Sequence, residues 1–356
     1  MDYQAKTIVL HINPAVPEDH IIAQAAQVIR AGGLVAFPTE TVYGLGANAL
    51  DSAALDRIYA AKRRPASDPL IAHIAHPDQL GQLAADVPYA AQRLATAFWP
   101  GPLTMVLRRA AHVPDNIATG MDTIAVRMPI HPVARALIEA SGTPIAAPSA
   151  NTFTRPSATT AAHVLEDLYG RVDIVIDGGA TPLGVESTVI DLTGAQPVVL
   201  RPGGLVMEDL LRVLPDITAI QRFVNEGEAT SAPGQMSKHY APRARLMLYD
   251  GSVEAVREAI TDTAQRYLAN GRKVGVLAGD EDAPYFTKLG VRIIALGKRD
   301  DSAAIARVLF GAMRALDAQN VDVILVPMMG GAGLGEAIRD RLMRAAEGRI
   351  YQVGDA

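Results

Sequence analysis

Short apolar runs alternate with longer amphipathic stretches along most of the chain, and the apolar runs close in Pro, Gly, Ser or Thr turns. Such runs predict buried strands, and the stretches with a helical period predict helices between them. In the first part of the chain the predicted strands span 33–37, 69–74, 103–107, 123–127, 144–147, 172–176, 187–191 and 198–201. The predicted helices there span 52–62, 87–97, 132–140 and 159–169. This alternation is typical of α/β or α+β folds, whose chemistry usually lies where strands end.

The pattern changes at 225–243, which is polar, punctuated by Gly and Pro, and without a period. After it the alternation resumes, with predicted strands at 245–249, 273–278, 291–295 and 321–326 and helices at 253–269, 302–319 and 334–346. The chain has 356 residues, more than twice a usual domain of ~150 residues. We therefore expect a domain at 1–224, a linker at 225–244 and a smaller α/β domain at 245–356.

Composition and charge narrow the class of protein. Hydrophobic residues make up 49% of the chain and charged residues 20%, which predicts a folded globular protein. The net charge is 33 − 38 = −5, so a uniformly basic nucleic-acid-binding surface is not expected and any anion site must be local. The absence of cysteine excludes disulfides, thiolate metal sites and cysteine nucleophiles.

We expect no membrane span, because no stretch reaches ~18 consecutive apolar residues. The apolar run before His11 is too short for a signal peptide. A cytoplasmic protein is the expectation.

Candidate chemistry first appears at 37–46, where the sequence Phe-Pro-Thr-Glu-Thr-Val-Tyr-Gly-Leu-Gly takes a strand into a turn rich in hydroxyls. Such a turn can offer backbone N–H groups and Thr hydroxyls to a polar ligand. An ordinary capped loop between a strand and a helix is the alternative.

Three adjacent cations, Lys62, Arg63 and Arg64, follow a predicted helix and precede two prolines. At a helix C-terminus cations oppose the helix dipole, so a solvated helix end is one interpretation. A phosphate-binding loop is the other, because the prolines hold the cations on a stiff segment. His73 and His76 lie three apart on a predicted strand and would face opposite sides, which makes a poor metal pair.

Two further strand ends carry polar groups. The turn at 148–151 presents Ser149 and Asn151, and it lacks the G-x-S-x-G elbow of a serine hydrolase. It is either a ligand shell of hydroxyl and amide groups or an Asx-turn. Arg127 and Arg201 also end predicted strands; singly each would be a surface charge, whereas together they would form a polyanion site.

The glycine-rich segment 330–335 follows a predicted strand, as a dinucleotide fingerprint would. Its spacing is wrong, and too little chain follows for the ribose-binding acid. We expect these glycines to serve tight packing. No P-loop motif is present either.

In their order along the chain these motifs resemble the YrdC-domain family. The matching segments are Pro38–Leu45, Lys62-x-Arg64-Pro65 with Pro69, Leu70 and His73, Trp99–Thr104, Val126-Arg127-x-Pro129, Pro148–Asn151, Glu186–Val189 and Arg201–Gly203. The segment 233–242, followed by an α/β domain, is similar to the longer, two-domain branch, the threonylcarbamoyl-AMP synthases.

The resemblance implies a fold and a reaction. The fold is a YrdC-like twisted mixed sheet around a deep basic cavity, with a smaller Rossmann-like α/β domain after it. The reaction converts L-threonine, bicarbonate and ATP into threonylcarbamoyl-AMP and pyrophosphate. The product then passes to a tRNA threonylcarbamoyl transferase complex for modification of tRNA.

The resemblance also assigns site residues. To threonine it gives Thr41, His73, Arg127, Ala147 and Ser187. To ATP it gives Lys62, Arg64, Asp68, Thr123, Ser149, Asn151, Ser157, Arg201 and, on a linker that folds over the site, Tyr240. Lys62 and Arg64 are the expected catalytic cations, and Arg63 receives no role. The C-terminal domain is expected to anchor the linker.

Physical reasoning agrees with this assignment. The threonine amine must capture bicarbonate or dissolved CO2, and the carbamate oxygen must then attack the α-phosphate in line. Such a reaction needs positioning and charge neutralisation more than a covalent nucleophile. Mg²⁺ bridging the phosphates of ATP is the expected cofactor.

Two other functions would use similar residues. An RNA-binding or ribosome-associated module could use the same basic cavity, but the net charge of −5 and the single Trp do not favour it. A carbamoyl-phosphate-using maturation enzyme would carry added cysteine modules, which the sequence lacks.

Overall fold

The computed structural model describes residues 6–220 and 239–354, which fall into two compact units. Within this part of the chain, the first unit comprises 6–153 and 157–220, and the second comprises 154–156 and 239–354. Most of the expected linker, 225–238, lies outside the described residues, while 239–244 belongs to the second unit.

The first unit contains a mixed sheet with the strand order β1-β8-β2-β3-β7-β4-β6-β5-β9-β10-β11. The sheet contains both parallel pairs, such as β4 with β6, and antiparallel pairs, such as β5 with β6, as expected of a mixed sheet. The strands are β1 (Ile8–His11), β2 (Val35–Phe37), β3 (Gly44–Asn48), β4 (Ile71–His73), β5 (Leu103–Arg108), β6 (Thr123–Arg127), β7 (Ile145–Ala146), β8 (Ile174–Asp177), β9 (Thr188–Asp191), β10 (Val198–Arg201) and β11 (Thr218–Ala219).

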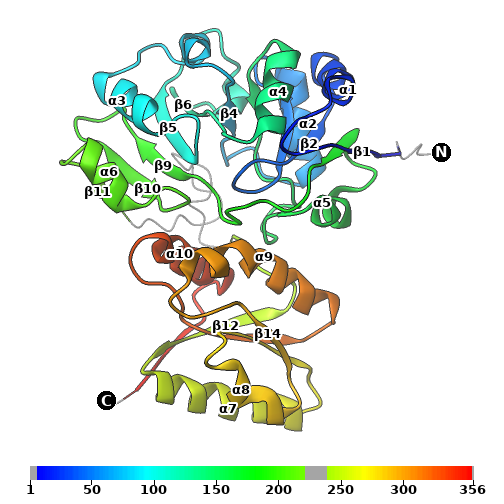
Figure 1. The fold of residues 1–356 in the computed structure, drawn as a ribbon, viewed down its shortest axis with the longest axis vertical. Coiled ribbons are helices and arrows are strands. Elements are labelled where there is room, and N and C mark those ends of the chain that lie inside the picture. Colours follow the sequence, from blue (N-terminus) through cyan, green and yellow to red (C-terminus); the bar gives the residue numbers. More distant parts are fainter. Residues whose placement is uncertain (1–5, 221–238, 355–356) are drawn as a thin grey trace. The chain divides into compact units, whose positions relative to one another are not determined.

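Helices cover this sheet from two sides (Figure 1). On one face α1 (Asp19–Arg30) and α4 (Pro132–Ser141) lie side by side and share a core with β2 and β8. The other face carries a larger core with contributions from α2 (Ser52–Lys62), α3 (Tyr89–Phe98), α5 (Ala161–Leu168) and α6 (Met207–Val213). Two 3₁₀ helices, η1 (Pro77–Gln82) and η2 (Asp115–Ile117), complete the unit.

The capping residues at its two ends explain where α2 begins and ends. Asp51 caps its N-terminus by accepting hydrogen bonds from the backbone N–H groups of Ala53 and Ala54. Its C-cap is Arg63, which adopts the left-handed conformation with φ 54°. The helix therefore stops where the basic motif begins and presents Lys62 from its last turn.

The pairing register of β4, β6 and β5 places three polar side chains in one row across the sheet. His73 of β4 and Thr104 of β5 both pair with Arg127 of β6, one from each side. Because paired residues point to the same face and strands lie ~4.8 Å apart, the three side chains form a row about 10 Å wide. On the same face, Ile71, Val106, Ala125, Val189 and Leu200 form a small apolar cluster.

The second unit is a parallel α/β domain, as expected. Its sheet has the order β14-β13-β15-β12-β16, and every pairing is parallel. This order differs from the 3-2-1-4-5 arrangement of a Rossmann fold, because β15 lies between β13 and β12. The strands are β12 (Arg245–Gly251), β13 (Val274–Ala278), β14 (Arg292–Ala295), β15 (Val323–Pro327) and β16 (Ile350–Val353).

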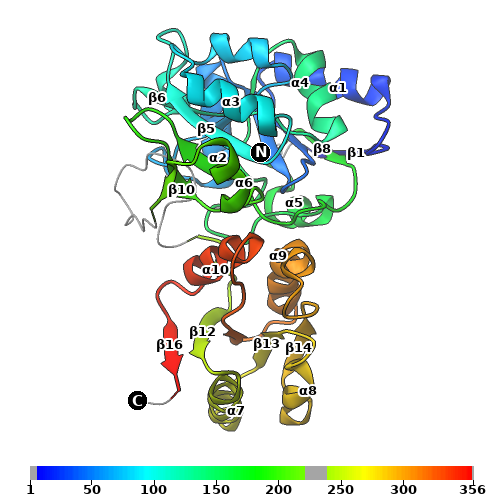
Figure 2. The same ribbon diagram turned by 60° about the vertical axis from the view of Figure 1, so that its left-hand side comes forward.

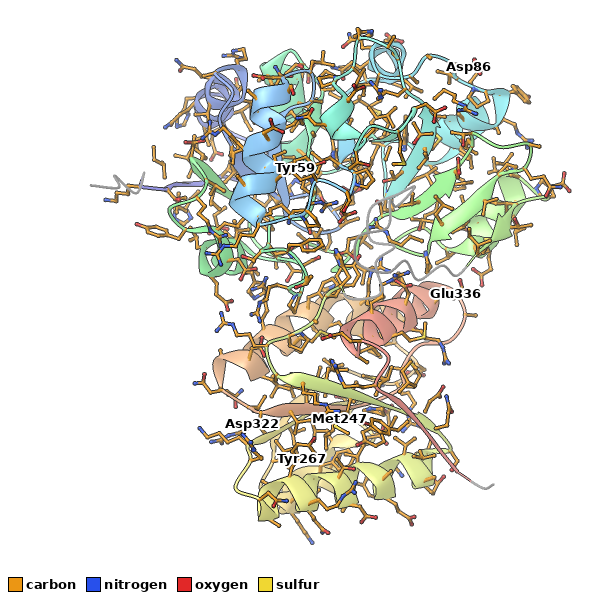
Figure 3. All side chains as sticks on the ribbon, turned by 180° about the vertical axis from the view of Figure 1, so that it is seen from behind. Tyr59, Asp86, Met247, Tyr267, Asp322 and Glu336 are labelled. Carbon is orange, nitrogen blue, oxygen red and sulfur yellow. The ribbon has the colours of Figure 1, made fainter. Side chains whose placement is uncertain are left out.

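Helices flank both faces of this sheet (Figure 2). One side holds α7 (Val253–Ala269) and α8 (Ala283–Phe286), followed by η3 (Thr287–Leu289), and the other holds α9 (Ser302–Ala318) and α10 (Leu334–Ala345). Met247 of β12 and Tyr267 of α7 meet in the core of the α7 side (Figure 3), where the Tyr267 hydroxyl lies 3.7 Å from the Met247 sulfur.

Two of the glycines at 330–335 are packed tightly, as expected: a Cβ on Gly330 would lie 2.2 Å from the carbonyl oxygen of Gly335, in the first turn of α10. A Cβ on Gly331 would have no neighbour within 4 Å, so the expectation does not hold there. None of the helices in 6–220 or 239–354 combines the length and apolar character that crossing a bilayer requires.

A substitution at Gly203 tests how closely the chain after β10 packs against the backbone of Ser187 and Thr188. A Cβ there would lie 2.3 Å from the carbonyl carbon of Ser187 and 2.4 Å from the backbone nitrogen of Thr188. We expect Gly203→Ala to lower the free energy of unfolding by about 1–3 kcal/mol, because backbone must shift to make room. Urea denaturation measures this. Gly194→Ala is the control, since its nearest neighbour would be 3.9 Å away; equal stabilities for the two variants would contradict the prediction.

Candidate active site

Arg127 ends β6 as a buried cation with a 4% exposed surface. Its Nη1 donates to the Thr41 hydroxyl at 2.9 Å, and its Nη2 donates to Glu40 Oε1 at 2.6 Å. Arg127 Nε and Glu40 Oε2 are buried and make no hydrogen bond to any described residue. The alternative that Arg127 and Arg201 are isolated surface charges is wrong, because Arg201 is also buried.

The hydroxyl-rich turn that contains Glu40 and Thr41 joins two antiparallel strands, β2 and β3, so the alternative of a loop leading into a helix is wrong. Within it the Thr39 hydroxyl donates to the carbonyl oxygen of Val42 at 2.7 Å and lies 2.8 Å from the Thr41 hydroxyl. Bonds of this kind fix the turn so that Glu40 and Thr41 both reach the guanidinium.

His73 stands beside Arg127 and is 2% exposed. Its Nδ1 lies 3.1 Å from the carbonyl oxygen of Ile71. Burial, together with the positive charge of Arg127, lowers the pKa of His73 to about 3. The ring is therefore neutral at physiological pH and adds a polar surface without a second charge. His76 lies beyond the end of β4, at the N-cap of η1, so the two histidines do not share the expected strand.

Ser187 extends the polar row on the far side of Thr104. The two hydroxyl oxygens are 2.7 Å apart, and Arg201 Nη2 donates to the Ser187 carbonyl at 2.8 Å. Ala147 closes the opposite end: its N–H donates to Ile71 at 2.9 Å, next to His73. The structure thus brings together all the residues that the resemblance assigned to threonine, namely Thr41, His73, Arg127, Ala147 and Ser187.

Lys62 is buried, with 1% of its surface exposed. Its ammonium donates to the carbonyl oxygens of Ser149 and Asn151, at 2.5 and 2.6 Å. Burial lowers the pKa of Lys62 well below its ordinary value, and the charge of Arg64 adds to this while Asp68 opposes it. An arriving phosphate would favour the charged form again. The basic motif and the 148–151 turn are therefore parts of one site.

Arg64 is also buried and forms an ion pair with Asp68, with Nη2 2.9 Å from Oδ2. Its Nε donates to the Asp68 carbonyl at 3.0 Å, so the guanidinium is held on both sides. Arg63, by contrast, is exposed. The interpretation as a solvated helix end applies to Arg63 only.

Of the remaining residues assigned to ATP, Ser157 and Thr123 lie in the first unit and Tyr240 lies in the second. Ser157 donates to Glu186 Oε1 at 2.5 Å, next to Ser187, and so joins the cluster. Thr123 shares a face of β6 with Arg127 but lies four residues before it, about 13 Å along the strand. Tyr240 is buried in the second unit, where its ring stacks on Phe310 with centroids 5.4 Å apart.

Three polar residues of this cluster received no assignment from the sequence: Glu40, Thr104 and Glu186. Each stood inside a segment that carried the resemblance, but nothing in their spacing showed that they would contact Arg127, Ser187 and Ser157. Glu40 stands between two conspicuous threonines, and such an acid is a signal only when its cationic partner is known.

A metal-binding cluster of three or more His, Asp or Glu side chains does not occur among the described residues. The acids of the site, Glu40, Asp68 and Glu186, are engaged with Arg127, Arg64 and Ser157. The described residues therefore do not form a cage for Mg²⁺.

Comparison with known proteins identifies the chain. A Sua5/YciO/YrdC family model, described as telomere recombination, matches residues 27–203, and a model described as threonylcarbamoyl-AMP synthase, C-terminal domain, matches 206–347. Threonylcarbamoyl-AMP synthase of Pyrococcus abyssi is 48% identical over 98% of this chain and 100% of its own length. The Bacillus subtilis enzyme is 44% identical over 94% of this chain and 95% of its own.

Structural similarity agrees with these matches. The crystal structure of P. abyssi Sua5 complexed with L-threonine has a TM-score of 0.91, with 47% identity, and the match covers 98% of this chain and 100% of that one. The chain therefore belongs to the threonylcarbamoyl-AMP synthase family, in the form that carries both the YrdC-type and the C-terminal domain. The expectation from the sequence motifs is confirmed.

The depressed pKa of His73 predicts a pH-dependent stability. Between pH 6.5 and pH 3 the unfolded chain binds a proton at this ring and the folded chain does not, so stability falls as the pH falls through this window. We expect wild type to lose roughly 2 kcal/mol more than His73→Gln between pH 7 and pH 4.5. Denaturation curves at both pH values measure the difference, and equal losses in the two proteins would contradict a neutral, buried His73.

Proposed function

We propose that this chain condenses L-threonine, bicarbonate and ATP into threonylcarbamoyl-AMP with release of pyrophosphate. The observation that supports this most is Arg127, a buried guanidinium fixed by Glu40 and Thr41 beside a neutral His73. A guanidinium held in this way is a receptor for a small carboxylate. The hydroxyls of Thr41 and Ser187 suit the rest of an amino acid that itself carries a hydroxyl.

The reaction has two steps in this proposal. The threonine amine attacks the carbon of CO2 or bicarbonate, and a C–N bond forms. With CO2 the nitrogen then releases a proton, whereas with bicarbonate a C–O bond breaks and the amine proton leaves with the displaced hydroxide as water. A carbamate oxygen then attacks the α-phosphorus of ATP, a P–O bond forms, and pyrophosphate leaves with the electrons of the broken bond. Both steps bring negative charges together, so their rate depends on cations that are already in position.

Lys62, Arg64 and Arg201 are the cations that we assign to the nucleotide. Each is buried and held by protein oxygens before substrate arrives, so little reorganisation is needed when phosphate groups bind. Mg²⁺ would enter with ATP, bound by phosphate oxygens, and would neutralise charge on the leaving pyrophosphate.

We further propose that the product passes to a tRNA threonylcarbamoyl transferase complex in the cytoplasm. The supporting argument is chemical, since a mixed carbamic–phosphoric anhydride is an activated acyl donor and needs an acceptor. The alternative of an RNA-binding module is not favoured, because relatives that match nearly the whole chain are named threonylcarbamoyl-AMP synthase.

The test follows pyrophosphate and labelled bicarbonate in mixtures of protein, ATP, Mg²⁺ and L-threonine. We expect pyrophosphate release that requires both threonine and bicarbonate, with the label in a nucleotide adduct. Arg127→Gln should raise the KM for threonine at least ~30-fold and Lys62→Met should raise the KM for ATP similarly, because each removes a buried charge contact worth about 2–5 kcal/mol.

Arg63→Gln is the matched control, because Arg63 lies between Lys62 and Arg64 but is exposed. It should leave both KM values within about twofold of wild type. Pyrophosphate release without threonine, or none from folded protein, would contradict the proposed function.

A further inference from the structure

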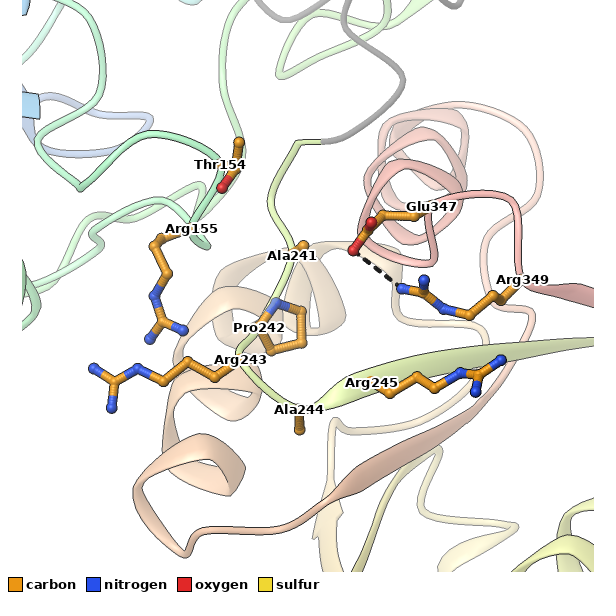
Figure 4. A pocket seen from close by; sticks show the side chains of 9 residues that line it. All are labelled: Thr154, Arg155, Ala241, Pro242, Arg243, Ala244, Arg245, Glu347 and Arg349. Carbon is orange, nitrogen blue, oxygen red and sulfur yellow. Dashed lines mark hydrogen bonds and ion pairs between the residues drawn. The ribbon is translucent and has the colours of Figure 1, made fainter. Parts of the chain in front are cut away.

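Several arginines gather at a cavity of about 350 Å³ in the second unit (Figure 4). Their guanidinium groups do not converge, because those of Arg243 and Arg245 lie on opposite sides of Pro242. Arg349 pairs with Glu347 at 3.1 Å. The cavity therefore does not form a focused anion site.

In the first unit, the loop 149–153 meets both ends of Lys62. The Lys62 ammonium donates to the carbonyl oxygens of Ser149 and Asn151, at 2.5 and 2.6 Å. At the backbone end, the N–H of Phe153 donates to the Lys62 carbonyl at 2.9 Å. All these residues belong to the first unit. A shift of the loop relative to α2 would therefore lengthen the hydrogen bonds that orient the ammonium.

The C-terminus of α2 leaves backbone carbonyls that the helix itself cannot satisfy. The N–H groups of the two residues after the helix donate to the carbonyls of Tyr59 and Ala60, and the loop donates to that of Lys62. The carbonyl of Ala61 is served by a side chain instead, because Arg171 Nη1 donates to it at 2.7 Å. Arg171 therefore completes the end of α2, where the helix dipole also favours a positive charge.

Arg171 reaches the loop as well. Its Nη2 donates to the hydroxyl of Thr152 at 3.0 Å, and Thr152 lies between Asn151 and Phe153. A guanidinium is a planar and rigid fork, so its two nitrogens limit the distance between Ala61 and Thr152. One side chain thus links the residue before Lys62 with the loop that orients Lys62.

Asp167 holds the same residue of the loop. Its Oδ2 accepts the N–H of Thr152 at 3.1 Å, and its carbonyl oxygen accepts the Thr152 hydroxyl at 3.3 Å and an N–H of Arg171. Asp167 is buried and lies in the last turn of α5, where the helix dipole opposes a negative charge. Its position is therefore explained by its partners rather than by its helix.

The charges of these two residues act on Lys62 in opposite directions. Burial is the main cause that lowers the pKa of Lys62, while the negative charge of Asp167 raises this pKa and the positive charge of Arg171 lowers it. Their hydrogen bonds, by contrast, hold the loop in the same place. Loss of charge and loss of position therefore predict different results for variants of the two residues.

We propose that Arg171 and Asp167 are positioning residues for Lys62. They hold Thr152 against the end of α2 and thereby fix the carbonyl oxygens that orient the Lys62 ammonium. This inference rests on the proposed function, in which Lys62 binds ATP. Both residues act through the backbone of the loop and of α2 rather than on the reacting atoms.

The experiment measures ATP-dependent pyrophosphate release by wild type, Arg171→Gln and Asp167→Ala. Each variant should raise the KM for ATP about tenfold, because the loop is released from α2, while the KM for threonine stays within about twofold. The double variant should raise the KM for ATP by less than the product of the single effects, because both residues act on Thr152. A KM for ATP within about twofold of wild type in both single variants overturns the proposal.

Conservative variants separate position from charge. Asp167→Asn keeps an oxygen that can accept the N–H of Thr152, so its KM for ATP should stay within about threefold of wild type. Arg171→Lys keeps the charge but loses the fork, so its KM for ATP should stay near that of Arg171→Gln. An effect of charge alone would shift the KM for ATP in opposite directions in Asp167→Asn and Arg171→Gln, and that result overturns the proposal.

Arg57→Gln is the matched control. Arg57 is another arginine of the first unit that donates to a backbone carbonyl, that of Gly32 at 2.7 Å, and it pairs with Asp173 at 2.9 Å. It lies on α2 more than one turn before Lys62 and does not reach the loop through these bonds. We expect its KM for ATP to stay within about twofold of wild type. A rise equal to that of Arg171→Gln would mean that destabilisation alone explains the effect, and the proposal would fail.

Hydrogen–deuterium exchange supplies a readout that needs no turnover. The amides of Thr152 and Phe153 should exchange faster in Arg171→Gln than in wild type, while the amides of 71–73 should not change. Equal exchange at 152–153 in the two proteins overturns the proposal, whatever reaction the protein catalyses. An inactive wild type overturns the proposed function instead, and faster exchange at 152–153 in Arg171→Gln would then still support the positioning of the loop.

Discussion

The site depends on burying the charge of Arg127. A guanidinium removed from water is costly unless its N–H groups find acceptors, and here Glu40 and Thr41 provide two of them. This requirement accounts for the rigid turn between β2 and β3, since the acceptors must stand at fixed positions. It also accounts for His73, whose proton would place a second positive charge beside the first.

The requirement that a buried cation find oxygen acceptors also applies to the cations assigned to ATP. Lys62 rests on two carbonyl oxygens, Arg64 on Asp68, and Arg201 on the backbone of Ser187. Each is held by protein oxygens before a ligand binds, so these cations stay buried in a protein whose net charge is −5. Positioning of this kind is what a reaction between anions needs, because the work of gathering cations has been done during folding.

Much of the fold could be predicted from the sequence, because periodicity marks buried strands and amphipathic helices directly. The strands that carry Arg127 and Arg201 and the helix that ends at Lys62 were all expected from it. The chain before residue 31 gave a weaker signal, and β1 and α1 were not predicted. For the turn after Phe37 the sequence allows either a ligand-binding turn or a loop leading into a helix. In the structure a strand follows it, and Gly44 and Gly46 belong to that strand.

The candidate site was harder to predict, because it depends on register between strands that are distant in sequence. Thr104 reaches Ser187 only because β5 pairs with β9, and it flanks Arg127 only because β5 also pairs with β6. Nothing in the sequence indicates that the partner of Glu40 is Arg127.

The claim that Arg127 is the carboxylate receptor can be tested directly by calorimetric titration of the wild-type protein with L-threonine and with L-threoninamide, which lacks the carboxylate. The account predicts that L-threonine binds at least ~30-fold more tightly, as expected for a buried charge pair worth 2 kcal/mol or more. Equal affinities for the two ligands would contradict it.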